Sequence, residues 1–168
     1  MYLRLVRPSL RYFSSFRYHV ANPEDRLATA AEYIAKRKDD WREKGKGSIT
    51  QSEFWLVDDD SYLGRVRIWH EPHGRRPAIA SHIEFEIPDE MRLRGLGTKL
   101  LALGLKKAKE IGIDPVLAGC EATNYPARNI IERNGGELLR VVRVQSHERR
   151  VKLRVYEISL SRPTQVVL

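Results

Sequence analysis

A strand, a helix and a second strand follow one another within residues 78–120, and this succession constrains the fold more than any other part of the chain. Residues 78–87 alternate between apolar and polar side chains, as expected for a strand. Apolar residues at helical spacing then lead to Gly112, and residues 116–120 form a short apolar run. Such a unit implies two parallel strands joined by a right-handed crossover. The apolar face of the first strand carries Ile79, Ile83, Phe85 and Ile87, and its polar face carries His82, Glu84 and Glu86.

Further elements flank this unit without a long linker or an internal repeat, so we expect residues 1–168 to form a single domain. The acid-free residues 1–23 would also fit an organellar transit peptide, but a strand and a short helix are the simpler interpretation. In the strand expected over residues 62–70, Arg65 and Arg67 share one face. The other expected strands are residues 3–6, 54–57, 137–145 and 149–160, and the expected helices follow Pro8, follow Asn22-Pro23 and span residues 126–133.

A basic loop with two glycines connects the strand to the helix of the central unit. It reads Arg92-Leu93-Arg94-Gly95-Leu96-Gly97-Thr98. The start of a helix leaves N–H donors unpaired and carries partial positive charge, so it binds anions such as a diphosphate. The glycines would let such a ligand approach the backbone, and the arginines add positive charge. The alternative is an ordinary turn with solvated arginines, and the loop fits neither the Rossmann nor the Walker pattern.

With this loop in this context, the sequence resembles the GNAT superfamily of N-acetyltransferases. The superfamily signature is Gln/Arg-x-x-Gly-x-Gly/Ala between the fourth strand and the third helix, and residues 92–97 match it. Asn124, Ala127 and Asn134-Gly135-Gly136 continue the resemblance, which is good over residues 54–136, and a bacterial subgroup of predicted acetyltransferases is the most similar. The resemblance implies an α+β (α/β-like) fold, with a mixed central sheet of roughly six to seven strands, about four helices and splayed parallel strands at the cofactor site.

The resemblance also implies acetyl-CoA as the acyl-donor co-substrate. The basic loop would hold the diphosphate, and Asn124 matches a family asparagine that faces the cofactor. A backbone N–H near Ile87 would polarise the thioester carbonyl. The residues expected to bind acetyl-CoA are Ile87, Arg92, Leu93, Arg94, Gly95, Leu96, Gly97, Thr98 and Asn124.

Carboxylates on the strand 78–87 are the candidates for the catalytic base. An amine must lose its proton before it attacks, and a lysine amine has a pKa of about 10.4. Glu84 is the preferred base, Glu86 the second choice and His82 the third, although acidic residues on a strand are more often simply solvated. A β-bulge would change which glutamate faces the cleft, and two neighbouring carboxylates raise each other's pKa.

The general acid departs from the family pattern. Many members carry a tyrosine seven residues after the asparagine, and that position is Ile131 in this sequence. Tyr125 is a weak substitute, and water can also protonate a thiolate leaving group. This departure leaves open a non-catalytic sensor that binds acyl-CoA.

Charge and cysteine content narrow the choice of partners and compartment. The net charge of +8 favours an anionic partner, and the basic residues of 137–160 would suit a nucleic-acid-binding module, but no nucleic-acid motif accompanies them. Cys120, the one cysteine, fits a reducing, cytoplasmic location, and we interpret it as a small core residue. No apolar run is long enough for a membrane helix, and the histidine spacing fits no metal site, so we expect neither a membrane partner nor a metal.

These observations favour an N-acetyltransferase that transfers an acetyl group from acetyl-CoA to an amine of a small molecule, peptide or protein. The alternatives are the acyl-CoA sensor and the basic nucleic-acid-binding module. Residues 161–168 fit either a loose tail or a strand lent to a partner chain, so a homodimer is one option.

Overall fold

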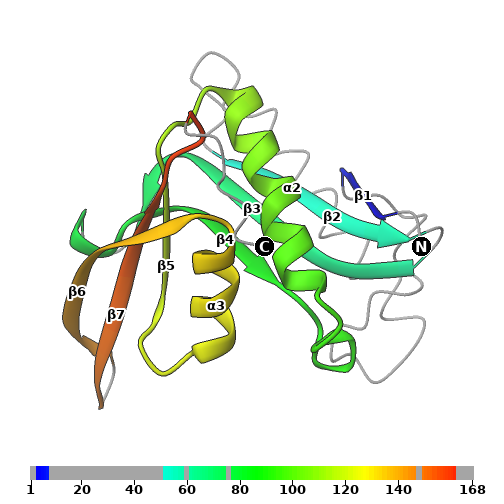
Figure 1. Cartoon of the computed structure of the whole chain (residues 1–168). Coiled ribbons are helices and arrows are strands. Elements are labelled where there is room, and N and C mark those ends of the chain that lie inside the picture. The colour runs from blue at the N-terminus through cyan, green and yellow to red at the C-terminus, as the bar shows by residue number, and fades with distance from the viewer. Residues whose placement is uncertain (1–2, 8–50, 59–60, 75–76, 147–148, 162–168) are drawn as a thin grey trace, which may run out of the picture.

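The computed structural model describes residues 3–7, 51–58, 61–74, 77–146 and 149–161 of the chain. These residues fold around a mixed β-sheet. The described sheet has seven strands in the spatial order β1-β2-β3-β4-β5-β7-β6 (Figure 1). All neighbouring pairs are antiparallel except β4 and β5, which run parallel. The strands are β1 (Leu3–Val6), β2 (Gln51–Asp58), β3 (Ser61–His73), β4 (Ser81–Glu86), β5 (Val116–Glu121), β6 (Gly136–Ser146) and β7 (Arg149–Ile158).

Two α-helices of the described part, α2 (Leu96–Ile111) and α3 (Tyr125–Arg133), lie on the same face of the sheet (Figure 1). Gly104 lets α2 approach the sheet closely, because a Cβ at this position would lie 2.8 Å from Val66 Cγ2 of β3. No helix within the described residues is long and apolar enough to cross a membrane. The face of α2 that packs on the sheet contributes Leu96, Leu100, Leu101, Gly104, Leu105 and Ala108 to the core.

The strand–helix–strand unit expected from the sequence is confirmed, because β4, α2 and β5 follow one another and β4 and β5 are parallel neighbours. The N-terminal strand and the β6–β7 hairpin are confirmed as well. The mixed sheet of seven strands agrees with the expected α+β class. The helices expected after Pro8 and Pro23 lie outside the described residues.

The first strand of the unit is shorter than the sequence pattern predicts. Residues 78–87 alternate as a strand would, but Pro77–Ile79 form a 3-10 turn (η2) and β4 begins only at Ser81. Pro77 has no backbone N–H for a ladder, and its fixed φ suits a helical turn. Ile79 therefore does not lie on the face of β4 that carries Ile83. A second 3-10 turn, η3 (Asp89–Met91), leads from β4 toward the basic loop.

Candidate functional site

A pocket of about 360 Å³ lies where the parallel strands β4 and β5 diverge. The ladder between them consists of one pair, Ile83 and Ala118, whereas β5 pairs with β7 along its whole length. The splay expected at the cofactor site is therefore present. The pocket is lined by Trp69, His73, Ser81, Ile83, Glu84, Phe85, Gly119, Cys120, Asn124 and Ala127.

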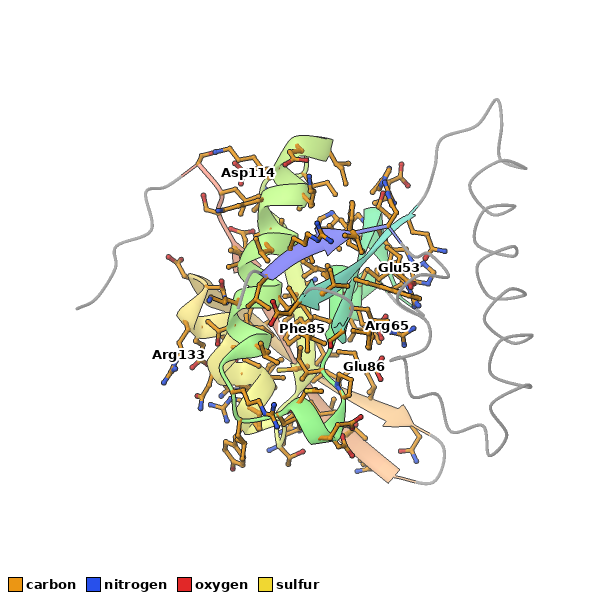
Figure 2. All side chains as sticks on the ribbon, turned by 90° about the vertical axis from the view of Figure 1, so that its right-hand side faces the viewer. Glu53, Arg65, Phe85, Glu86, Asp114 and Arg133 are labelled. Atoms are coloured by element: carbon orange, nitrogen blue, oxygen red, sulfur yellow. The ribbon has the colours of Figure 1, made fainter. Side chains whose placement is uncertain are left out.

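The lining residues come from both faces of the sheet. Ile83 faces α2, because a Cβ at Gly104 would lie 3.1 Å from Ile83 Cδ1. Phe85 shares this face by the alternation of β4, and Glu84 points to the opposite face. Figure 2 shows Phe85 on the helical side of the sheet and Glu86 on the other side. Side chains from both faces of the sheet thus line the pocket.

The basic loop enters α2 through a left-handed backbone turn. Gly95 is the N-cap at φ 72°, and its oxygen accepts the first intrahelical bond, from Lys99 N at 3.3 Å. The N–H groups of residues 96–98 therefore precede the helical ladder, and no side chain caps them. Leu93 is also left-handed, at φ 61°, with a fully exposed side chain. Turns with left-handed residues can gather N–H groups into a concave anion site, so this geometry supports the diphosphate loop, which stays a prediction.

The two arginines of the loop are not equivalent. Arg92 forms a 2.7 Å ion pair with Asp89 of η3, so part of its charge is already balanced. Arg94 is exposed, and Thr98 lies in the first turn of α2. Arg94 is thus the arginine of this loop whose charge we expect a bound anion to meet most directly.

Gly97 has a packing role that the sequence does not suggest. A Cβ at Gly97 would lie 2.6 Å from Ile130 Cδ1, so its missing side chain makes room for α3. A Cβ at Gly95 would meet nothing within 4 Å. The space beside Gly95 is thus open, whereas a side chain at Gly97 would meet α3, and cofactor binding at both glycines stays a prediction. The helix turns residue 97 toward α3, a non-local contact that the loop sequence does not show.

The two glutamates of β4 differ in their relation to the pocket. Glu84 lines it, whereas Glu86 is not among the lining residues. Each carboxylate meets an arginine of β3: Arg67 lies 3.3 Å from Glu84 Oε2, and Arg65 lies 2.6 Å from Glu86 Oε2. Figure 2 shows Arg65 and Glu86 next to each other. The pattern predicts a pair of neighbouring carboxylates, but the structure adds a cation beside each of them.

His82, the third candidate base, links the two parallel strands. Its Nδ1 accepts a hydrogen bond from the N–H of Leu117 at 2.9 Å, and burial lowers the pKa of its imidazole. An Nδ1 that accepts must be unprotonated, so His82 is held neutral. His82 does not line the pocket, and we assign it to strand pairing rather than to proton transfer.

A family model described as an acetyltransferase (GNAT) domain matches residues 6–137. The chain belongs to the GNAT acetyltransferase family. The resemblance found in the sequence is thereby confirmed, and the matched range includes the basic loop, both parallel strands and α3.

Individual relatives agree with this membership. The mycothiol acetyltransferase of Pseudarthrobacter chlorophenolicus is 28% identical over 127 residues, which are 73% of this chain and 36% of that protein. The match thus spans 36% of the length of this curated relative. RimJ of Mycobacterium smegmatis, solved with CoA-disulfide, has a TM-score of 0.67 at 13% identity. The match covers 94% of this chain and 82% of the RimJ chain. The acetyltransferase yncA of Salmonella typhimurium, solved with acetyl-CoA, has a TM-score of 0.61 at 12% identity and covers 96% of each chain. Both structures show the shared fold.

The tyrosine position of the GNAT pattern is part of the core in this chain. Ile131 is completely buried, and a Cβ at Gly136 would lie 2.4 Å from it. Tyr125, the substitute considered from the sequence, is 64% exposed and lies against Arg128 rather than in the pocket. Neither residue meets the pocket, so a role of Tyr125 in catalysis stays an unsupported prediction.

Of the residues that line the pocket, Glu84 and Asn124 are predicted site residues, and the others are not: Trp69, His73, Ser81, Ile83, Phe85, Gly119, Cys120 and Ala127. Trp69 and His73 stack with their ring centroids 5.0 Å apart. Cys120 packs against the core and also lines the pocket, so its interpretation as a core residue is incomplete. The sequence signal for a position of Cys120 at the pocket is its place near the end of β5, shortly before Asn124.

Asn124 both lines the pocket and begins α3. Its Oδ1 accepts from Ala127 N at 3.1 Å, which is an N-cap. Replacing Asn124 by Ala is expected to lower the free energy of unfolding by about 1 kcal/mol, because the cap is lost. Asn129→Ala is the matched control in the interior of the same helix, and we expect it to cause no loss. Denaturant unfolding measures both, and equal losses would contradict the capping role.

Proposed function

We propose that this GNAT domain transfers the acetyl group of acetyl-CoA to an amine. The observation that carries the proposal is the pocket between the splayed strands, in which Asn124 and Glu84 both take part. Family membership supports acetyl transfer, and the location of the carboxylate supports an amine as acceptor. A cytoplasmic location, a homodimer and a single domain over residues 1–168 stay predictions.

The residues of the loop fit the diphosphate of acetyl-CoA. Free N–H groups at residues 96–98, the open side of Gly95 and the exposed Arg94 offer hydrogen bonds and charge to a phosphate. Ile87 directly follows the last residue of β4, where pairing with β3 has ended after Glu86. Its N–H is therefore the predicted donor to the thioester oxygen.

Bound acetyl-CoA supplies a thioester, whose carbonyl carbon the amine attacks while the C–S bond breaks. Glu84 lies on the face of the sheet opposite α2, and the acceptor enters from this side. Glu84 takes one proton of the incoming ammonium group. Glu84 is preferred over Glu86 because only Glu84 lines the pocket. When the tetrahedral intermediate collapses, the attacking nitrogen releases its second proton to water, and water protonates the departing thiolate, since thiols have a pKa of about 8.5 and leave readily.

The non-catalytic sensor is the second candidate, and the burial of Ile131 favours it. Mass spectrometry of an amine library incubated with the protein and acetyl-CoA separates the two functions. We expect at least one acetylated amine, with an equal amount of free CoA. Acetyl-CoA binding in calorimetry without any acetylated product would support the sensor and contradict the enzyme.

Cys120 provides a direct reporter for the pocket, because the chain has one cysteine. Burial raises the pKa of its thiol, against the opposing effect of Arg128 and Arg154. We expect alkylation by iodoacetamide to be slower than that of a free thiol at neutral pH and to accelerate at alkaline pH, because the thiolate reacts. Saturating acetyl-CoA should suppress the labelling. Cys120→Ser is the blank, and a rate unaffected by acetyl-CoA would contradict this location.

A further inference from the structure

A buried carboxylate lies two strands away from Glu84 in the sheet. Glu53 of β2 is only 1% exposed, and a buried charge needs close partners to be tolerated. Trp55 Nε1 donates to Glu53 Oε1 at 3.0 Å. Arg67 donates to Glu53 Oε2 from Nε at 3.3 Å and from NH2 at 3.2 Å. Arg67 therefore uses both Nε and NH2 to hold Glu53.

The remaining nitrogen of the Arg67 guanidinium contacts Glu84, which lines the pocket. Arg67 NH1 lies 3.3 Å from Glu84 Oε2, and the guanidinium stands 5.5 Å from the ring centroid of Trp69. Glu53, Arg67 and Glu84 are directly opposed residues on the neighbouring strands β2, β3 and β4. The strand register therefore fixes the order carboxylate, guanidinium, carboxylate across one face of the sheet.

The next rung of the sheet provides an internal comparison. Arg65 meets Glu86 at 2.6 Å, and the residue of β2 opposite Arg65 in the register is Trp55. The contact of Glu84 with its arginine is longer, at 3.3 Å, than the 2.7–2.9 Å usual for charge-assisted bonds. An arginine shared with Glu53 thus leaves Glu84 loosely paired, and a loosely paired carboxylate can turn to an incoming ammonium group.

We propose that Glu53 is a positioning residue for acetyl transfer: by holding Arg67 it sets the place and the charge surroundings of Glu84 at the pocket. This inference rests on the proposed function. Without the charge of Glu53, the whole guanidinium is available to Glu84, and the pair closes as it does between Arg65 and Glu86. The acceptor then loses the carboxylate that receives its proton.

Glu53→Gln keeps the shape of the side chain and removes its charge. We expect it to lower kcat/KM for the amine about 10- to 100-fold, the range reached when a catalytic group is misplaced by about 1 Å. The Kd for acetyl-CoA in calorimetry should be unchanged, because the loop 92–98 is not involved. Glu53→Asp keeps the charge and should restore part of the rate. In a Glu84→Gln background, Glu53→Gln should change the remaining rate by less than about twofold, whereas in a Glu86→Gln background its full effect should persist.

Equal losses from Glu53→Gln with and without Glu84 would overturn the proposal, because Glu53 would then act independently of Glu84. A crystal structure of Glu53→Gln needs no substrate and separates this inference from the proposed function. We expect Arg67 to have moved toward Glu84, within the distance now seen between Arg65 and Glu86. Arg67 and Glu84 in their parent positions would overturn the inference, whether or not an acceptor amine is found.

Discussion

Glu84→Gln is expected to lower kcat/KM for the acceptor amine about 10²- to 10⁴-fold, the usual contribution of a general base. The amide keeps the size of the side chain but cannot take a proton from the incoming ammonium group. Glu84 is the carboxylate of β4 that lines the pocket, so no other glutamate of this strand is placed to replace it. Steady-state kinetics with an accepted amine measure the effect, and calorimetry should show unchanged binding of acetyl-CoA.

Glu86→Gln is the matched control for this experiment. Glu86 lies on the same strand and the same face as Glu84, each side chain has an exposed fraction of 59%, and each meets an arginine of β3. The two differ in their position relative to the pocket and in the length of the arginine contact, which is 3.3 Å for Glu84 and 2.6 Å for Glu86. We expect Glu86→Gln to stay within about threefold of the parent rate, as is usual for an exposed residue away from the reacting atoms. A large loss from Glu86→Gln together with full activity of Glu84→Gln would reverse the assignment of the base.

Gly95→Ala is expected to weaken acetyl-CoA binding about tenfold or more. A Cβ disfavours the left-handed conformation that Gly95 adopts at φ 72° by roughly 1–2 kcal/mol, so we expect the free variant to relax from this turn and to spend binding energy on restoring it. The new methyl group would also stand in the open space on which a diphosphate must close, and 1.4 kcal/mol already corresponds to a factor of ten in Kd. Isothermal calorimetry with acetyl-CoA gives the Kd.

Gly97→Ala is the control for Gly95→Ala. Its Cβ would press on the far end of the flexible Ile130 side chain, which can shift, and alanine favours the helix by about 1 kcal/mol. We therefore expect a Kd within about threefold of the parent value, since the N–H groups of the loop are unchanged. Equal losses of affinity in the two variants would contradict the distinction between the glycines.

Local pattern was sufficient for the parts of the fold that repeat with a fixed period. The alternation over residues 78–87 predicts Ile83 and Phe85 on one face and Glu84 on the other, which the structure confirms, and Gly112 marks the end of the helix. The prediction failed at Ile79, where the alternation continues by coincidence into a 3-10 turn. An apolar–polar alternation can continue from a strand into the turn before it, so the alternation alone does not show at which residue the strand begins.

The candidate site was only partly accessible from the sequence, because its less obvious features are contacts between distant segments. The loop is predicted from its glycines and arginines at the start of a helix, and Asn124 from the resemblance to the family. The pairing of Arg67 with Glu84 depends on the register of β3 and β4, which no local pattern fixes, although Arg65 and Arg67 were already placed on one strand face. The contact of Gly97 with Ile130 likewise depends on the packing of α2 against α3.

A crystal structure of the protein grown with acetyl-CoA tests the central claim most directly. We expect the diphosphate to accept hydrogen bonds from the N–H groups of residues 96–98, and the thioester to lie between β4 and β5 beside Glu84. A diphosphate bound elsewhere, with the turn at Gly95 empty and the pocket between the two strands unchanged, would contradict the account.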